Sequence, residues 1–214
     1  MSATRRNILG AALAAPLLAQ LTGAASGAAA EKYGTVSDGW IEVRWTRAVQ
    51  AELDRIGAEV EAVAPARLVK DSQGPAVRFP VRSGKGDPSL AQPAKAEGDG
   101  ALDGGIAVRT ALGTARFLDL RSALGDGLAS GTCVVNGVEV AHLAALRCGL
   151  AEGQLATGTA ALGKPLKVRI NEVPLRATAE ALDAYTATFG TSPFTAETVL
   201  GYATAEGVYT PPEA

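Results

Sequence analysis

The stretch Cys133-Val134-Val135-Asn136-Gly137-Val138-Glu139-Val140 decides the fold class of this chain. Its two arms are rich in β-branched residues, and Asn-Gly between them is the strongest short signal for a two-residue hairpin turn. That turn needs a positive φ at both central residues, which Asn and Gly tolerate. We therefore predict two antiparallel strands joined at Asn136 and Gly137. The following segment, 142–148, fits either a strand or a helix.

Strand patterns continue on both sides of this hairpin. Segments 106–110 and 115–120 flank a short turn and predict a second hairpin. Pro80 interrupts an alternating segment and predicts an edge strand or a strand end, because proline donates no ladder hydrogen bond. Segment 83–105 is rich in Gly, Pro and Asp and predicts a long loop. Alternation of apolar and polar residues, typical of half-buried strands, occurs in three segments: 41–45, 77–81 and 166–170.

Two short helices follow strands. Thr46 can cap a helix that Gly57 is placed to end, and Thr178 can cap a second helix that closes at Gly190. Because the two strand-helix units look alike, an internal repeat stays an open reading. The apolar residues expected to share one helix face are Val49, Leu53 and Ile56 in the first helix and Leu182, Tyr185 and Phe189 in the second.

The fold class follows from these elements. Short strands with frequent turns and two helices predict a mainly β fold, either an antiparallel β-sandwich or a curled sheet, with the two short helices packed at its ends. We expect a single β-rich domain over residues 31–209 and a disordered tail over 210–214. A doubly wound α/β fold is disfavoured, because the middle of the chain supplies no helices to alternate with strands.

The N-terminus has the pattern of an export signal. Arg5 and Arg6 form a charged start, 11–21 is a mildly apolar stretch, and Ala28-Ala29-Ala30 offers a small-residue cleavage site. We predict that residues 1–30 are a cleaved twin-arginine signal peptide that engages the twin-arginine translocase. The mature protein is then expected to be soluble and either secreted or in the cell envelope.

A membrane anchor is the alternative reading of the same segment. Spanning a bilayer takes about 20 predominantly apolar residues, whereas Pro16 and Gln20 interrupt this stretch. We therefore expect no stable membrane anchor.

Charge argues against nucleic acid as a partner. Removing residues 1–30 from the 214-residue chain leaves 184 residues and takes away Arg5 and Arg6, so that 18 basic residues face 22 acidic ones, a formal charge of −4. Nucleic acid binding needs a dominant basic surface.

Cys133 and Cys148 are the two cysteines, and an exported chain meets an oxidising compartment. We predict that they form a disulfide, which in a loop of this size stabilises the fold by about 3 kcal/mol. Two unpaired buried thiols are the alternative. A metal site is a third and poorer reading, because one His and two Cys are too few ligands for a closed zinc site.

Catalytic motifs are weak in this sequence. His142 is the one histidine, its neighbours are apolar, and we read it as a structural or surface residue. Carboxylate pairs such as Glu59 with Glu61 or Glu52 with Asp54 could flank a glycosidic bond, although acids at such spacing are ordinarily solvated. We assign no catalytic, cofactor-binding or metal-ligating residue.

The chain resembles a group of uncharacterised secreted actinobacterial proteins. The resemblance rests on turn glycines and core residues in Val77-x-Phe79-Pro80-Val81-x-x-Gly84, in Gly104-Gly105-Ile106, and in the segment from Leu175 to Gly201. A more remote similarity, in Gly39 to Trp45 and the central Gly-Gly, links it to the HtaA-type haem-binding domain.

The HtaA resemblance implies a β-rich fold and haem bound through a Tyr that a His supports. This chain has Leu102-Asp103-Gly104-Gly105 where a His-Gly pair would be expected. We therefore expect no specific haem binding. The candidate ligands are Tyr33, Tyr185, Tyr202 and Tyr209.

Three functional hypotheses follow. The leading one is a non-enzymatic exported protein that binds a partner or ligand, or contributes to envelope structure, and needs no cofactor. The second is binding of haem or another small ligand by an HtaA-like domain. The third is an exported hydrolase that uses carboxylates.

Overall fold

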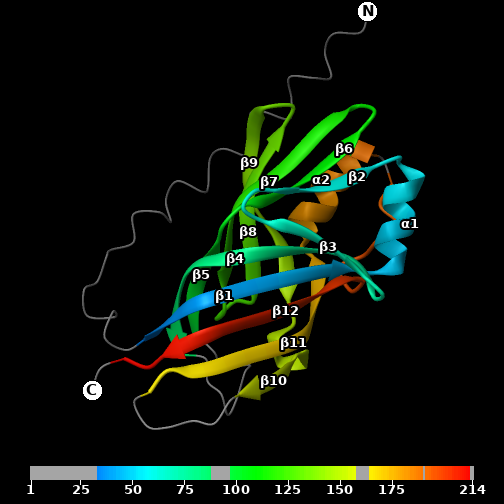
Figure 1. Ribbon diagram of the computed structural model, residues 1–214. Coiled ribbons are helices and arrows are strands. Elements are labelled where there is room, and N and C mark those ends of the chain that lie inside the picture. The colour runs from blue at the N-terminus through cyan, green and yellow to red at the C-terminus, as the bar shows by residue number, and fades with distance from the viewer. Residues whose placement is uncertain (1–32, 88–96, 158–163, 190, 213–214) are drawn as a thin grey trace, which may run out of the picture. The chain divides into compact units, whose positions relative to one another are not determined.

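The computed structural model describes residues 33–87, 97–157, 164–189 and 191–212 (Figure 1). All of them belong to the unit Glu31–Ala214. The predicted signal peptide, residues 1–30, lies outside these ranges, as do Gly190 and the last two residues of the predicted tail. None of the helices within the described ranges is long and apolar enough to span a membrane.

In the described part of the chain, twelve strands form one sheet, which is accompanied by two α-helices and a short 3-10 helix (Figure 1). The helices are α1 (Arg47–Arg55), α2 (Ala179–Phe189) and η3 (Leu150–Glu152). The strands are β1 (Gly34–Trp45), β2 (Glu59–Val63), β3 (Arg67–Asp71), β4 (Gly74–Asp87), β5 (Glu97–Leu102), β6 (Gly105–Thr110), β7 (Gly113–Ala123), β8 (Leu128–Val135), β9 (Val138–Cys148), β10 (Gln154–Thr157), β11 (Leu166–Ala177) and β12 (Val199–Thr210).

The sheet closes on itself. Eight strands follow one another in the order β7, β5, β4, β1, β12, β11, β9, β8, and β8 pairs with β7 again. The strand pairs are antiparallel, as in the pairing of Ile41 with Ala205 and with Phe79. A mainly β, antiparallel fold with two helices is therefore confirmed. The expected sandwich or open curled sheet is corrected to a closed sheet, because the β7–β8 pairing joins its two ends.

Both predicted hairpins are present. Asn136 and Gly137 take φ values of 50° and 83° in the turn between β8 and β9. Thr110 pairs with Gly113 across the turn between β6 and β7. Segment 142–148, left open between strand and helix, belongs to β9.

Pro80 does not mark an edge strand, contrary to our expectation. It lies inside β4, which pairs with β1 along most of its length. On its other side β4 pairs with β3 up to Arg78 and with β5 from Val81 onward. Pro80 falls in the gap between those two neighbours, where no ladder bond requires its missing N–H, and its carbonyl accepts a bond from the Asp103 backbone N at 2.9 Å.

The predicted loop over 83–105 is also corrected, because most of its described residues are in strands β4 and β5. Glycine allows the two strands to approach closely: a Cβ on Gly98 would lie 2.2 Å from the Lys85 carbonyl oxygen, and φ at Gly98 is 140°. A glycine-rich composition that usually indicates a loop here permits a tight strand pair. Likewise Thr210, expected in the tail, pairs with Thr35 as the last residue of β12.

The hydrophobic core lies on the inner face of the closed sheet. Val77 is completely buried and Phe79 is 3% exposed, and both belong to one cluster with Ala66 and Leu102. Partly buried residues of β1, β2, β6 and β7 pack against this cluster. These side chains fill the middle of the interior and leave open space on either side of it.

Candidate ligand-binding cavity

A cavity of about 530 Å³ lies between the two helices and the inner face of the sheet, and we call it the helix-side cavity. Strands β1, β2, β6, β7, β8, β9, β11 and β12 contribute to its walls. Large apolar side chains dominate the lining, among them Trp45, Leu53, Phe117, Leu143, Leu182 and Phe194. The volume and the apolar walls match those of small-molecule sites, which span roughly 300–1,000 Å³.

The predicted apolar face of helix α1 lines this cavity. The Thr46 hydroxyl accepts a bond from the Val49 backbone N at 3.3 Å and so caps the helix. Val49, Leu53 and Ile56 then recur at helical spacing and line the cavity. Gly57, with a φ of 59°, follows the last turn as expected.

Helix α2 forms the facing wall. The Thr178 hydroxyl accepts from the Ala181 backbone N at 3.1 Å and donates to the Ala144 carbonyl at 2.6 Å, so the same residue caps the helix and ties it to β9. Leu182 and Tyr185, three residues apart, lie on the cavity side.

A polar cluster joins the two helices at the cavity. The Tyr185 hydroxyl donates a hydrogen bond to Glu52 Oε1. Arg55 holds the same carboxylate through two bonds, from Nε to Oε2 at 2.6 Å and from Nη2 to Oε1 at 2.5 Å. Glu52 is only 8% exposed, and among the described residues it is the one carboxylate of the lining.

The charge state of this cluster follows from its contacts. The hydrogen bonds from Arg55 and then from Tyr185 lower the pKa of Glu52 from its usual 4.5 to about 2. Burial, followed by the bond to Glu52, raises the pKa of Tyr185. Near neutral pH the cavity therefore carries a paired carboxylate and a neutral phenol that acts as a hydrogen-bond donor.

The expected Cys133–Cys148 disulfide does not form in this structure, where both cysteines are free. The Cys148 backbone N donates to the Gly127 carbonyl at 2.6 Å, which places Cys148 at the far end of β8 from Cys133. Six residues along the strand separate Gly127, which lies beside Cys148, from Cys133, and this corresponds to about 20 Å. A disulfide requires the two Cα atoms to lie within roughly 7 Å of each other. Cys133 lines the cavity, and burial raises the pKa of its thiol.

His142 does not converge on the cavity. It lies on β9 opposite Thr132, whose hydroxyl is 3.3 Å from the His142 Nδ1, and its side chain is exposed. The structure therefore does not bring together a tyrosine and this histidine within the cavity.

Of the four candidate tyrosines, Tyr185 alone lines the helix-side cavity in the described part of the chain. Tyr33 donates to Glu97 at 2.8 Å, and Tyr202 is 45% exposed. Tyr209 borders a different cavity.

Sequence reasoning did not single out Glu52 and Arg55 as a unit with Tyr185. One signal was available, because Glu52 falls three residues after Val49 on the predicted apolar face. A charged residue at such a position needs a partner.

The carboxylate hydrolase hypothesis finds no support in this cavity. The pKa of Glu52 is lowered, whereas a general acid needs a raised value. The other suggested pair, Glu59 and Glu61, does not line the cavity. Glu61 instead forms an ion pair of 2.9 Å with Arg109.

Comparison with solved structures identifies the fold. The chain is similar to the C-terminal domain of HtaA from Corynebacterium glutamicum, with a TM-score of 0.51 and 12% identity over 82% of this chain and 99% of that domain. It also aligns with the haem-binding protein HtaB of the same organism, with a TM-score of 0.39 and 11% identity over 83% of this chain and 94% of that one. No protein-family profile and no curated protein matches the sequence. At this identity the similarity to HtaA shows a shared fold.

Proposed function

We propose that this chain is a non-enzymatic binding module that takes a mostly apolar small molecule into the helix-side cavity. One observation carries the proposal: a cavity of about 530 Å³ whose walls are mainly apolar and which is bordered by the hydrogen-bonded pair Tyr185 and Glu52. Sites of this kind bind by burying apolar surface and use a few polar groups to orient the ligand. Filling such a cavity with side chains would have been the simpler way to stabilise the fold.

The polar cluster would orient a bound ligand. Tyr185 and Glu52 lie on facing helices, so a ligand between the helices would meet the phenol and the carboxylate on one side and mainly hydrocarbon elsewhere. The other polar side chains of the described lining are Thr110, Thr114, Cys133, Asn136 and Ser192. A ligand with one polar end is therefore the best match. Arg55 neutralises Glu52, which lowers the cost of keeping the carboxylate near apolar ligand atoms.

Haem is the second candidate ligand. A tyrosine can hold haem iron, and a hydrogen-bonded partner orients such a ligand. Tyr185 would be the iron ligand and Glu52 its partner, in place of the histidine that the HtaA resemblance led us to expect. Iron ligation requires the phenolate, and burial, followed by the bond to Glu52, raises the pKa of Tyr185 in the ligand-free protein. A bound iron would lower the pKa of its own ligand, as bound cations do.

Titration of the chain from residue 31 with phenylnaphthylamine, an apolar fluorescent probe, tests the proposal. We expect saturable binding of one probe per cavity, and weakening of about tenfold or more in Ala145→Leu, which fills part of the lining. Ala48→Leu is the matched control, because Ala48 is exposed on α1 and does not line the cavity. Equal affinity of the two variants would refute the site.

Haemin is titrated in parallel. A stoichiometric Soret band that is lost in Tyr185→Phe but kept in Tyr202→Phe would promote haem to the first ligand. A band no stronger than that of an unrelated control protein would remove it.

A further inference from the structure

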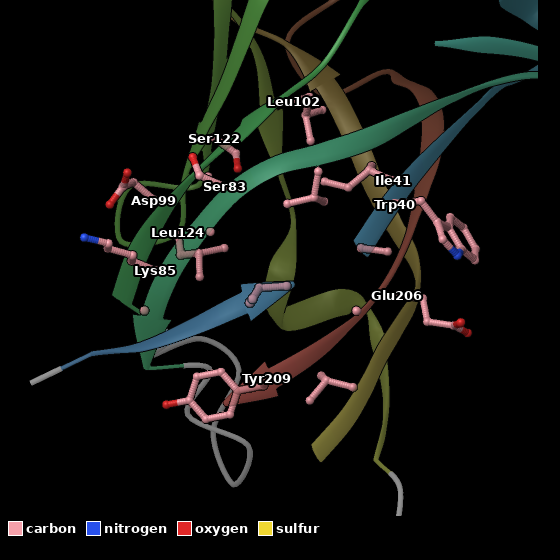
Figure 2. A pocket seen from close by; sticks show the side chains of 18 of the residues that line it. Trp40, Ile41, Ser83, Lys85, Asp99, Leu102, Ser122, Leu124, Glu206 and Tyr209 are labelled. Atoms are coloured by element: carbon pink, nitrogen blue, oxygen red, sulfur yellow. The ribbon is translucent and has the colours of Figure 1, made fainter. Parts of the chain in front are cut away.

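A second cavity of about 200 Å³ lies within the same closed sheet (Figure 2). We call it the small cavity. It shares no lining residue with the helix-side cavity. On β1, Ile41 lines the small cavity and Val43, the next residue on the same face, lines the helix-side cavity. Their β4 partners, Phe79 and Val77, belong to the core that separates the two spaces.

Glycines keep the small cavity open. Gly84 and Gly100 pair with each other on β4 and β5, and both line the cavity, whereas Val81 and Leu102 occupy the corresponding inner positions nearer the core. A Cβ on Gly100 would lie 3.3 Å from the Ser122 hydroxyl and 3.5 Å from the Ser83 carbonyl oxygen. A methyl group at Gly100 would therefore fit with slightly tight to ordinary contacts, whereas a Cβ on Gly84 would lie 3.1 Å from the Val36 Cβ, so that glycine allows Val36 to pack closely against β4.

The walls of this cavity are mainly aliphatic. Two of its larger neighbours do not fill it: in Figure 2, Trp40 and Glu206 point away from the space between the strands. Glu206 is engaged outside, where it pairs with Lys167 at 2.9 Å and Arg169 at 3.4 Å. The apolar walls include the side chains of Val36, Ile41, Val81, Leu102, Leu124, Val168, Ile170 and Ala205.

We infer that the small cavity is a second binding site, for a mostly apolar molecule or group of about the size of one aromatic ring. The volume of the small cavity limits the size of the ligand. An apolar cavity of roughly 150 Å³ is sufficient to bind benzene, so a space of 200 Å³ accommodates a substituted ring but not a ligand that would fill the helix-side cavity. The Ser122 hydroxyl and the Ser83 backbone carbonyl lie near Gly100 at the border of the space and can meet one polar substituent.

Toluene is the probe for this site, and methyl-resolved NMR of the chain from residue 31 is the measurement. We expect toluene to shift the methyl signals of Val36 and Val168 saturably. Ala205→Leu, which fills the lining, should weaken that binding about tenfold or more, whereas Ala145→Leu in the other cavity should leave it unchanged. Methyl signals of Leu53 and Leu182 report separately on the helix-side cavity.

Each result decides the inference independently of the proposed function. No shift at Val36 and Val168, or equal toluene binding in Ala205→Leu, would overturn the second site, whatever the helix-side methyls do. Should Ala205→Leu fail to fold, Gly100→Ala replaces it, because its Cβ meets only the two serine oxygens at ordinary or slightly tight distances. That variant should weaken toluene binding severalfold.

Discussion

Replacing Val77 by Ala tests whether the middle of the closed sheet is a packed core. Val77 is completely buried, pairs with Val43 on β1 and with Leu68 on β3, and belongs to the central cluster. The substitution removes two methyl groups, a transfer loss of about 1.6 kcal/mol at roughly 0.8 kcal/mol each. If roughly 50 Å³ stays open, the cavity adds about 1.2 kcal/mol. We expect the free energy of unfolding to fall by about 3 kcal/mol.

Urea unfolding followed by circular dichroism measures this loss. In a domain of this size, about 3 kcal/mol corresponds to a fall in Tm of roughly 6–12 °C. Val138→Ala is the matched control, because Val138 is 65% exposed at the β8–β9 turn and should change stability by less than about 0.5 kcal/mol. A loss below about 1 kcal/mol for Val77→Ala, or one equal to that of the control, would refute the packed core between two cavities.

Three further predictions concern charge, thiols and export. The pKa of Glu52 is lowered from 4.5 to about 2, so its charged form stabilises the fold fully above pH 4.5, and this stabilisation is lost as the pH falls towards 2. The difference in Tm between wild type and Glu52→Gln should therefore shrink between pH 4.5 and pH 2. A difference in Tm that stays constant over this range would contradict the prediction. Cys133 and Cys148 should both take up an alkylating reagent when unreduced protein is unfolded, giving an intact mass with two labels, and an unlabelled mass would restore the disulfide. Changing Arg5 and Arg6 together to Lys should leave precursor in the cytoplasm, whereas undiminished secretion would exclude the twin-arginine route.

Local features of the fold were predictable because short-range chemistry determines them. Asn136-Gly137 specifies its turn through the positive φ of both residues, and Thr46 and Thr178 specify helix starts through side-chain caps. The alternation of apolar and polar residues over 41–45 correctly identified which side chains of β1 share the apolar face.

Strand partners were not predictable, because alternation identifies a face and not a neighbour. Ile41 pairs with Ala205, far away in the sequence, and nothing in either segment encodes that choice. Closure of the sheet depends on such pairings. The disulfide prediction was wrong for a related reason: the register of β8 and β9 carries Cys148 away from Cys133, although few residues separate them along the chain.

The candidate site was predictable only in its apolar half. Leu53 and Leu182 could be assigned to helix faces, but whether those faces meet each other or solvent depends on how the helices dock on the sheet. The contact of Tyr185 with Glu52 spans 133 residues of sequence and follows only from that docking.

Methyl-resolved NMR of the protein titrated to saturation with phenylnaphthylamine shows whether a ligand occupies the helix-side cavity. We expect saturable shifts of the Leu53 and Leu182 methyl signals at one probe per cavity, with little change at Val36 in the small cavity. Shifts confined to the exposed valines Val138 and Val140, or no saturable shift at Leu53 and Leu182, would show that the probe binds elsewhere and would contradict it.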